Sequence, residues 1–139
     1  MPVADRIPET FLDFFDRPIL AHLATVMPDG SPQVTPIWIG YADGLLLVNT
    51  IVGRQKDRNL AEQTRVALTM VDPDDPYRYM QVRGTVVEAT TEGAEDNIDQ
   101  LSLRYTGVPY PRHDPNRPRK LFKITPTRVI YQHHVGEIK

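Results

Sequence analysis

Val48 to Leu60, which reads V-N-T-I-V-G-R-Q-K-D-R-N-L, is the stretch that best predicts how the chain folds. The apolar run Leu45 to Val48 leads into it and predicts a buried strand. The polar pair Asn49-Thr50 ends that strand, and Gly53 predicts a turn. Arg54 to Gln63 then has the pattern of a short helix. The stretch therefore predicts a strand and a helix joined by a glycine turn.

Three cations and an amide open this helix: Arg54, Lys56, Arg58 and Asn59. Unpaired backbone N–H groups and the positive end of the helix dipole both favour an anion at such a position. Arginine supplies a planar fork of donors and lysine a point charge. The pattern predicts a phosphate-binding site, whereas a solvated basic helix face is the alternative for Arg54 and Lys56 taken alone.

The composition excludes several classes of protein. A length of 139 residues fits one domain over residues 1–139, and a hydrophobic content of 40% fits a folded chain. The net charge of -2 argues against a nucleic-acid binder. Without cysteine there is no disulfide frame and no thiol nucleophile. No apolar run reaches membrane-spanning length and acidic residues interrupt the N-terminal segment, so we expect a cytoplasmic protein without membrane contact.

The residues before the opening stretch predict a helix and a hairpin. Ile7 to Phe15 has an amphipathic helical pattern, and Ile19 to Val26 predicts a strand. Met27 to Ser31 is a strong turn sequence, and Pro32 to Tyr41 predicts the returning strand. Pro36 lies inside that strand, which indicates an edge, a bulge or a departure from the ladder.

The residues after the opening stretch are again mostly strands. Gly84 indicates a bulge or a close approach of two backbones. Strands joined by tight turns, with helices at the margins, predict a mainly antiparallel β-barrel of the all-β or α+β class. The predicted elements are strands over Arg65 to Val71 and Tyr77 to Thr90, a helix capped by Thr91 with Ile98, Leu101 and Tyr105 buried, an irregular loop over Gly107 to Pro118, and two strands, Arg119 to Ile124 and Arg128 to Gln132, broken by Pro126.

The sequence predicts no catalytic or metal-binding side chain. The histidines and serines are His22, His113, His133, His134, Ser31 and Ser102. No histidine pair has the helical spacing or the acidic companion of a zinc site, and neither serine lies in a nucleophile elbow. The acidic run Asp72 to Asp75 is typical of a turn and lacks calcium-loop spacing. The remaining chemical candidates are the cationic helix start and the strand that precedes it.

That strand offers a surface for a flat ligand. Along it, Gln33 and Thr35 point to one side and Val34, Pro36 and Trp38 to the other. The irregularity at Pro36 can expose backbone N–H and C=O groups to a planar molecule. Trp38 either walls such a pocket or, more commonly for tryptophan, packs in the core.

Taken in order, these motifs resemble the pyridoxamine-phosphate-oxidase-like flavin and deazaflavin proteins. The resemblance is strongest to the PPOX class oxidoreductases that use the deazaflavin coenzyme F-420. The segments that carry it are Ala24-Thr25, Asp29 to Trp38, Asn49-Thr50, Gly53 to Leu60, Asp72 with Asp75 to Tyr79, Val82 to Thr85, Tyr105 to Gly107, Pro109-Tyr110 and Ile124 to Pro126.

The resemblance implies a split β-barrel homodimer with cofactor sites at the subunit interface. Arg54 and Lys56 would hold a phosphate with support from Asn59, and the cofactor ring would lie along the strand that contains Pro36. The partner chain would close the site through Tyr77, Arg78 or Tyr79. The implied cofactor-binding residues are Gln33, Val34, Thr35, Pro36, Ile37, Asn49, Thr50, Arg54, Lys56, Asn59, Tyr77 and Tyr79.

The implied function is an F-420-dependent oxidoreductase that transfers hydride to a small unsaturated or conjugated substrate. In such enzymes the cofactor performs the chemistry, which accounts for the lack of a catalytic constellation. Tyr79 or Arg83 are candidates to assist protonation. FMN shares the ring, side-chain and phosphate plan, so Arg54 and Lys56 do not separate the two cofactors. The alternatives are therefore an FMN-dependent oxidoreductase and a non-catalytic flavin- or haem-binding storage module.

Overall fold

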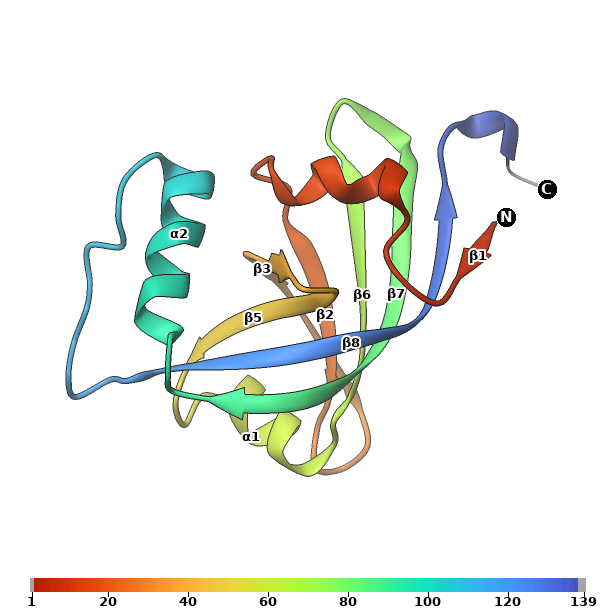
Figure 1. The fold of residues 1–139 in the computed structure, drawn as a ribbon. Helices are drawn as coiled ribbons and strands as arrows, with labels where there is room; N and C mark the ends of the chain where they lie inside the picture. Colours follow the sequence, from red (N-terminus) through yellow and green to blue (C-terminus); the bar gives the residue numbers. More distant parts are fainter. Residues whose placement is uncertain (1, 138–139) are drawn as a thin grey trace.

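The structure, a computed structural model, describes residues 2–137. One 8-stranded antiparallel sheet curls into a split β-barrel, which confirms the predicted fold class (Figure 1). The strands are β1 (Val3–Ala4), β2 (Ala21–Val26), β3 (Pro32–Ile37), β4 (Gly40–Ala42), β5 (Leu45–Ile51), β6 (Arg65–Asp72), β7 (Asp75–Thr90) and β8 (Arg119–Gln132). Their order is β3-β2-β6-β7-β8-β5-β4, with β1 paired to β8, so β3 is an edge strand.

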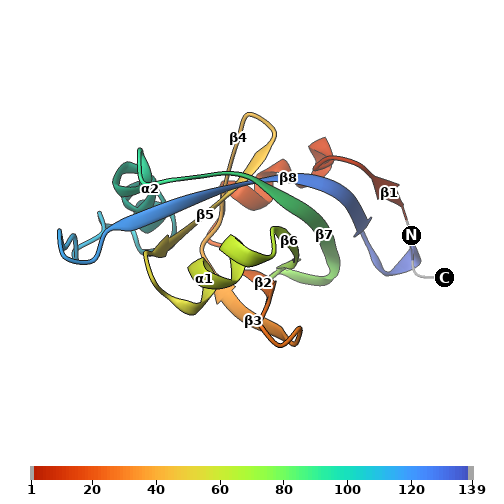
Figure 2. The same cartoon turned by 90° about the horizontal axis from the view of Figure 1, so that it is seen from below.

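The helices lie at the margins of this sheet. They are the 3-10 helices η1 (Glu9–Phe15) and η2 (Val135–Glu137) and the α-helices α1 (Gln55–Glu62) and α2 (Ala94–Thr106). In Figure 1, η1 lies at the same end as the β6–β7 hairpin, and α1 lies at the opposite end. α1 contacts β2 and β5 below the barrel (Figure 2), and α2 contacts β5 and β8. Within residues 2–137 no helix is both long and apolar enough to cross a membrane.

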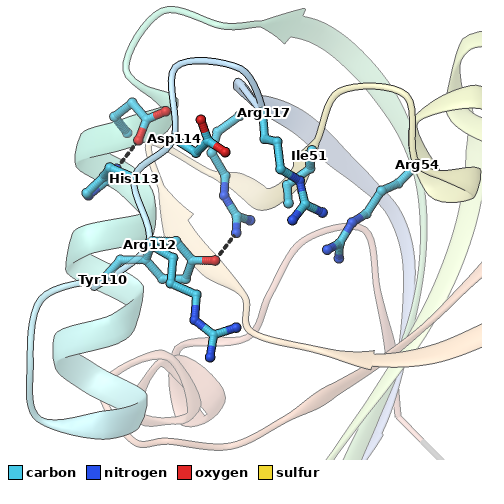
Figure 3. Close-up of a pocket in the computed structure, with 9 residues that line it drawn as sticks. Ile51, Arg54, Tyr110, Arg112, His113, Asp114 and Arg117 are labelled. Atoms are coloured by element: carbon cyan, nitrogen blue, oxygen red, sulfur yellow. Dashed lines mark hydrogen bonds and ion pairs between the residues drawn. The ribbon is translucent and has the colours of Figure 1, made fainter.

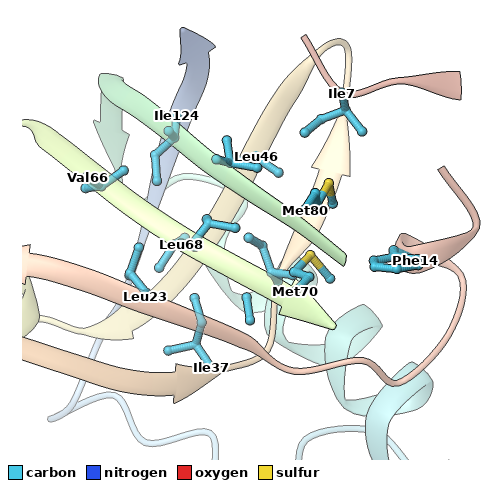
Figure 4. Packing of buried hydrophobic residues seen from close by; sticks show 14 of the residues in the cluster. Ile7, Phe14, Leu23, Ile37, Leu46, Val66, Leu68, Met70, Met80 and Ile124 are labelled. Carbon is cyan, nitrogen blue, oxygen red and sulfur yellow. The ribbon is translucent and has the colours of Figure 1, made fainter. Parts of the chain in front are cut away.

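The hydrophobic core fills the inside of the curled sheet (Figure 4). Along β6 the alternate residues Val66, Leu68 and Met70 are buried, as expected for a strand with one face inward. Burying one large apolar side chain contributes about 1.5–3 kcal/mol. The end of the barrel beneath η1 is closed by three buried aromatic side chains, Phe11, Phe14 and Phe15.

An ion-pair network fastens η1 to the β6–β7 hairpin. The carboxylate of Asp72 is 8% exposed and accepts hydrogen bonds from Arg17 at 2.8 Å and Arg78 at 2.9 Å. Both arginines also pair with Asp13 of η1. The bond from Arg17 lowers the pKa of Asp72 well below its usual range, although burial opposes the shift, and Arg78 adds to it. Asp72 therefore remains ionised and anchors the cap of the barrel.

Two predicted strands that contain a proline differ from the observed ones. The predicted strand from Pro32 to Tyr41 ends at Ile37, and the N–H of Ile39 donates to the hydroxyl of Tyr105 instead of continuing the ladder. The predicted break at Pro126 was wrong, because β8 continues through it. Pro126 pairs with Gly84 where the β7–β8 register shifts, so its missing N–H falls at a bulge.

Gly84 confirms the predicted close approach of two backbones. A Cβ atom at this position would lie 2.7 Å from Ile124 Cγ2 and 2.8 Å from the carbonyl oxygen of Thr125. Both distances are too short for a real side chain, so β7 and β8 pack at this point only because residue 84 is glycine.

The helices also depart from prediction in detail. Ile7 to Phe15 forms a 3-10 helix that begins at Glu9. Thr91 does not cap α2: the N-cap is Gly93, with φ of 78° and no side-chain cap. Glycine reaches this left-handed conformation without the penalty that a Cβ atom brings, which moves the helix start two residues onward.

Candidate cofactor-binding site

The turn before α1 is held by backbone and carboxylate contacts. Gly53 has φ of 92°, and its N–H donates to Asp57 Oδ2 at 2.8 Å. Lys120 of β8 donates to Asp57 Oδ1 at 2.9 Å. Burial alone would raise the pKa of Asp57, but these two donors outweigh it and lower that pKa. Because Asp57 already occupies the Gly53 N–H, an anion at this helix start depends chiefly on side chains.

Two of the cations at this helix start form no ion pair with any residue that the structure describes. Arg58 donates to the Gly53 carbonyl at 2.9 Å and to Gln55 Oε1 at 2.6 Å. Within residues 2–137, Arg54 and Lys56 form no side-chain hydrogen bond or ion pair. Burial lowers the pKa of Lys56, and the neighbouring charge of Arg54 lowers it further. The pair therefore carries positive charge that an anionic ligand would neutralise.

Strand pairing brings a second cationic segment beside Arg54. β5 pairs with β8 so that Ile51 lies opposite Arg119, and the N–H of Val52 donates to the Pro118 carbonyl at 2.9 Å. The irregular loop before β8, residues 107–118, therefore runs next to the turn before α1. This contact joins residues more than 60 positions apart in the sequence.

A cavity of about 420 Å³ lies between that loop and the turn. Figure 3 shows the side chains of Arg54 and Arg117 directed toward the same space, whereas the side chain of Arg112 points away from them at the edge of the cavity. Its charged lining comprises four arginines, Arg54, Arg112, Arg117 and Arg119, with His113 and two carboxylates, Glu95 and Asp114. The excess of guanidinium groups suits a ligand that carries several negative charges.

A second, more apolar cavity of about 330 Å³ adjoins the first and shares Tyr110 and Arg119 with it. Trp38 lines this cavity and stacks on Tyr105, with ring centroids 5.4 Å apart and an angle of 8°. Trp38 is thus partly buried and walls a pocket, rather than filling the core. The other residues lining the second cavity are Leu20, Pro36, Ile37, Asn49, Ile98 and Leu101.

Arg119 and Asn49 connect the two cavities to α2. Arg119 donates to Asn49 Oδ1 at 3.3 Å and to the Tyr110 hydroxyl at 2.5 Å, and its guanidinium lies 4.6 Å from the centre of the Tyr110 ring. The amide of Asn49 donates to the Ala94 carbonyl at 2.8 Å and to Asn97 Oδ1 at 3.0 Å. These bonds fix the wall between the cationic and the apolar cavity.

β3 presents an unpaired backbone edge beside the apolar cavity. The N–H of Met27 donates to the Ser31 carbonyl, so these two residues form a hydrogen-bonded pair. Hydrogen-bonded and non-hydrogen-bonded pairs alternate along an antiparallel ladder, which makes Val34 and Pro36 members of non-hydrogen-bonded pairs. On this alternation the N–H of Val34 and the carbonyl of Pro36 point away from β2. The hydroxyl oxygen of Thr35 is buried and has no hydrogen-bond partner within residues 2–137. The two backbone groups at this edge fit the polar rim of a flat heterocycle, whereas the buried Thr35 hydroxyl is not exposed to a ligand.

Asn59 ties the helix start to β3 from beneath. Its side chain is 1% exposed, and its amide donates to Thr25 Oγ1 at 3.0 Å and to Gln33 Oε1 at 3.4 Å. Gln55 donates to Asn59 Oδ1 at 2.8 Å. Asn59 and Gln33 therefore hold α1 against the sheet and face each other, not the cavities.

The remaining predicted site residues lie apart from the cavities. Thr50 is buried, and Val34 is exposed on the outer face of the sheet. Tyr77 and Tyr79 lie near the start of β7, and neither lines either cavity. The hairpin that joins β7 to β6 is at the end of the barrel opposite α1 (Figure 1). Arg78 is engaged by the ion pairs of η1. One chain thus brings together Pro36, Ile37, Asn49 and Arg54, with Lys56 beside Arg54.

The prediction missed the arginines of the irregular loop and of the first position of β8. Arg112, Arg117 and Arg119 fall within the run R-H-D-P-N-R-P-R, whose three arginines in eight positions were a signal of cationic function. Within residues 2–137 no group of three or more acidic or histidine side chains is placed to hold a metal ion.

Comparison with known proteins gives the family. The family model for pyridoxamine 5'-phosphate oxidase matches residues 7–133. An F-420 reductase is 34% identical over 89% of this chain and 98% of its own, with a TM-score of 0.79. A conserved hypothetical protein of Mycobacterium tuberculosis is 26% identical over 95% of this chain and 89% of its own, with a TM-score of 0.67.

General stress protein 26 of Bacillus anthracis shares the fold at 21% identity, with a TM-score of 0.69 over 89% of this chain and 92% of its own. No curated protein matches the chain. A family match over most of the chain agrees with the split barrel, its edge strand and the cationic helix start. The chain belongs to the pyridoxamine 5'-phosphate oxidase family of flavin-binding oxidoreductases.

Proposed function

We propose that the protein is an oxidoreductase that uses the deazaflavin coenzyme F-420 to transfer hydride to a small unsaturated or conjugated substrate. The observation that carries the proposal is the uncompensated charge of Arg54 and Lys56 beside a cavity with three further arginines. Similarity to an F-420 reductase at 34% identity supports the choice of cofactor. In this proposal residues 1–139 act as one cofactor-binding unit.

The cofactor would extend from the cationic cavity to the edge of β3. Arg54 and Lys56 would hold its phosphate, and the backbone groups of Val34 and Pro36 would bond the rim of its ring. Asn49 would border the ring through the apolar cavity. When bound, the reduced coenzyme supplies the hydride, and the chain supplies binding, orientation and exclusion of water.

The extent of the cationic cavity favours F-420 over FMN. FMN ends at its phosphate, whereas F-420 continues beyond its phosphate into a chain of carboxylates. Arg54 and Lys56 are sufficient for one phosphate. Arg112, Arg117 and Arg119 lie in the same cavity and would pair with anionic groups beyond it.

The apolar cavity would hold the substrate next to the ring. Trp38 stacked on Tyr105 offers an aromatic wall, and Leu20 and Leu101 offer aliphatic contacts. Such a wall favours a flat conjugated molecule over a charged or highly polar one. This matches the proposed reduction of a conjugated double bond.

We further propose that two copies of the chain form the working unit, in the cytoplasm. The outer face of β3, β2, β6 and β7 exposes Val34, Val71 and Tyr77, with exposed fractions of 60%, 39% and 51%. A second copy covering this face would bring its Tyr77 and Tyr79 toward the open edge of β3. In one chain these two tyrosines lie at the far end of the barrel.

Cofactor binding tests the proposal directly. Calorimetry with purified protein should give at least micromolar affinity for F-420 and weaker affinity for FMN. The double variant Arg54→Gln, Lys56→Gln should lose on the order of 2–5 kcal/mol of binding energy for each cation that pairs with a desolvated phosphate. Arg58→Gln is the matched control, because Arg58 already has partners in the chain. Tight FMN binding without F-420 binding would overturn the choice of cofactor.

Turnover separates an enzyme from a storage module. Reduced F-420 bound to the protein should be oxidised rapidly by a panel of enones and quinones, at a rate above that of free coenzyme. Oxidation no faster than in solution would leave a flavin- or haem-binding storage module as the better description.

A further inference from the structure

His113 bridges the arginine-bearing loop to α2. Its Nδ1 contacts Glu95 Oε2, and its Nε2 lies 2.7 Å from Asp99 Oδ1. The N–H of Tyr110, in the same loop, also donates to Asp99 Oδ1 at 3.1 Å. Residues 107–118 contain no helix or strand, so these bonds supply much of their attachment to α2.

The bridge lies next to the side chains that give the cavity its charge. Arg112 precedes His113 directly, Arg117 follows four residues later, and all three line the cationic cavity. In a loop without regular structure, ordering long side chains has a cost in conformational entropy. The contact with α2 therefore bears on how well Arg112 and Arg117 are placed.

The geometry requires a protonated ring. A neutral imidazole has one N–H donor and one acceptor nitrogen, so it can donate to only one of the two carboxylates. The other carboxylate would then face a lone pair. Only the imidazolium donates to Glu95 and Asp99 together, so the full bridge exists in the charged form alone.

We propose that His113, as an imidazolium, is a positioning residue that fastens the loop to α2 and so places Arg112 and Arg117 for an anionic ligand. The ligand part of this proposal rests on the proposed function, because it takes the cationic cavity to be the anion-binding end of the cofactor site. The fastening of the loop is independent of any ligand.

The charged neighbours of His113 determine how the bridge responds to pH. The carboxylates of Asp99 and Glu95 on α2 raise the pKa of His113 above its ordinary value of 6.5. On the loop, Arg112 and Asp114 flank it and the Tyr110 ring meets it edge-on. Across the cavity lie the guanidinium groups of Arg54, Arg117 and Arg119, which oppose protonation until an anion neutralises them.

The direction of the effect follows from the raised pKa. The bridge is complete below the pKa of His113 in the unfolded chain and is lost as pH rises through the raised pKa of the folded state. Because an anion in the cavity favours the charged ring, bound anion should raise the pKa of His113 further. The same coupling makes anion binding weaker above that pKa.

The experiment uses the full chain and inorganic sulfate, whose charge is constant from about pH 5.5 to about pH 9, around the histidine range. Proton NMR follows the His113 ring, and amide hydrogen exchange, corrected for the intrinsic rate at each pH, follows residues 107–118. We expect protection of the loop to fall as His113 deprotonates. Saturating sulfate should raise the pKa of His113, and sulfate affinity should fall at least about fivefold across the transition.

Three variants test whether His113 positions the arginines for an anion or only contributes to the stability of the fold. His113→Gln should bind sulfate weakly at every pH, with a flat profile. His113→Arg keeps a charged fork between Glu95 and Asp99, so it should retain both loop protection and binding, again with a flat profile. His134→Gln is the matched control, because the side chain of His134 is 65% exposed beside η2 and lines neither cavity, so this change should leave the profile of the wild type unchanged.

Each outcome decides a separate point. Loop protection that does not depend on pH, or an unchanged His113→Gln variant, overturns the bridge. Protection that follows His113 while sulfate fails to bind at any pH overturns the anion-binding role, and with it this part of the proposed function, but leaves the bridge intact. If F-420 does not bind but sulfate binding still depends on the protonation of His113 as expected, only the cofactor assignment is overturned.

Discussion

Replacing Lys56 with methionine should raise the stability of the ligand-free protein and lower its affinity for an anionic ligand. Lys56 is half-buried, lies beside Arg54 and has no anionic partner within residues 2–137. Lys56→Met keeps an unbranched apolar stem in place and removes only the charge. If Lys56 served only to stabilise the fold, replacing it would leave the stability of the protein unchanged or lower it.

The size of the gain follows from two terms. Relief of like-charge repulsion between two exposed or half-exposed cations is worth about 0.5–1 kcal/mol. Relief of the desolvation of Lys56 has the same sign. A gain of about 1 kcal/mol corresponds to a rise of about 3–5 °C in Tm for a chain of this size. Binding of an anionic ligand should weaken by about 2 kcal/mol or more, because a charge that pairs with a desolvated anion is lost.

The effect should also depend on pH in one direction. The pKa of Lys56 is lowered from 10.5, so the unfolded chain binds its proton more tightly than the folded chain does. Stability of the wild type therefore rises as pH increases through the lowered pKa, and the advantage of Lys56→Met shrinks there. Urea denaturation in buffer free of phosphate and sulfate, at neutral and alkaline pH, measures both the gain and its loss.

The matched control is Arg58→Met, on the same helix. Arg58 donates to the Gly53 carbonyl and to Gln55, so this change should lower stability slightly and leave anion binding unaltered. If Lys56→Met destabilised the ligand-free protein as much as Arg58→Met does, Lys56 would be a structural residue. The assignment of Lys56 to the phosphate would then fail.

Three further substitutions test the scaffold by urea denaturation. Gly84→Ala should cost about 1–3 kcal/mol, because its Cβ would lie 2.7 Å from Ile124 Cγ2. Asp72→Asn should cost about 3 kcal/mol at neutral pH, since Arg17 and Arg78 lose the buried carboxylate that they share and keep only more exposed partners such as Asp13. That loss should shrink as pH falls below 3.8, because the pKa of Asp72 is lowered in the folded state. Asn59→Ala should cost about 1–3 kcal/mol by leaving the Thr25 hydroxyl with fewer partners.

The local parts of the fold were predictable because their causes are local. The strand before Gly53, the helix after it and the edge position of Pro36 follow from hydrophobic alternation and from the turn chemistry of glycine and proline. β8 was predicted as two strands because Pro126 lacks an N–H. Its continuity depends on Gly84, 42 positions earlier, which faces Pro126 at a register shift. No local pattern contains that pairing.

Only the part of the candidate site whose residues are close together in the sequence was predictable from the residues themselves. Arg54, Lys56 and Asn49 lie close together in sequence, and the resemblance joined them to Pro36. The cationic cavity depends on the pairing of Ile51 with Arg119, which no neighbouring residue specifies. The resemblance gave Asn59 a supporting role at the phosphate, and the structure adds what the motif did not contain, namely that buried Asn59 holds α1 to the sheet.

The site combines a rigid half and an adjustable half. The strands β2 and β3 and the helix α1 are fixed to one another through Asn59, a buried side chain whose bonds to Thr25, Gln33 and Gln55 do not depend on pH. The loop that adds Arg112 and Arg117 is attached through His113, an exposed group that holds both carboxylates only when charged. A ligand with a single phosphate would depend on the rigid half alone. A ligand with further negative charge would also depend on the loop, so its affinity should fall as His113 loses its proton. The affinity of a ligand with a single phosphate should not depend on the protonation of His113.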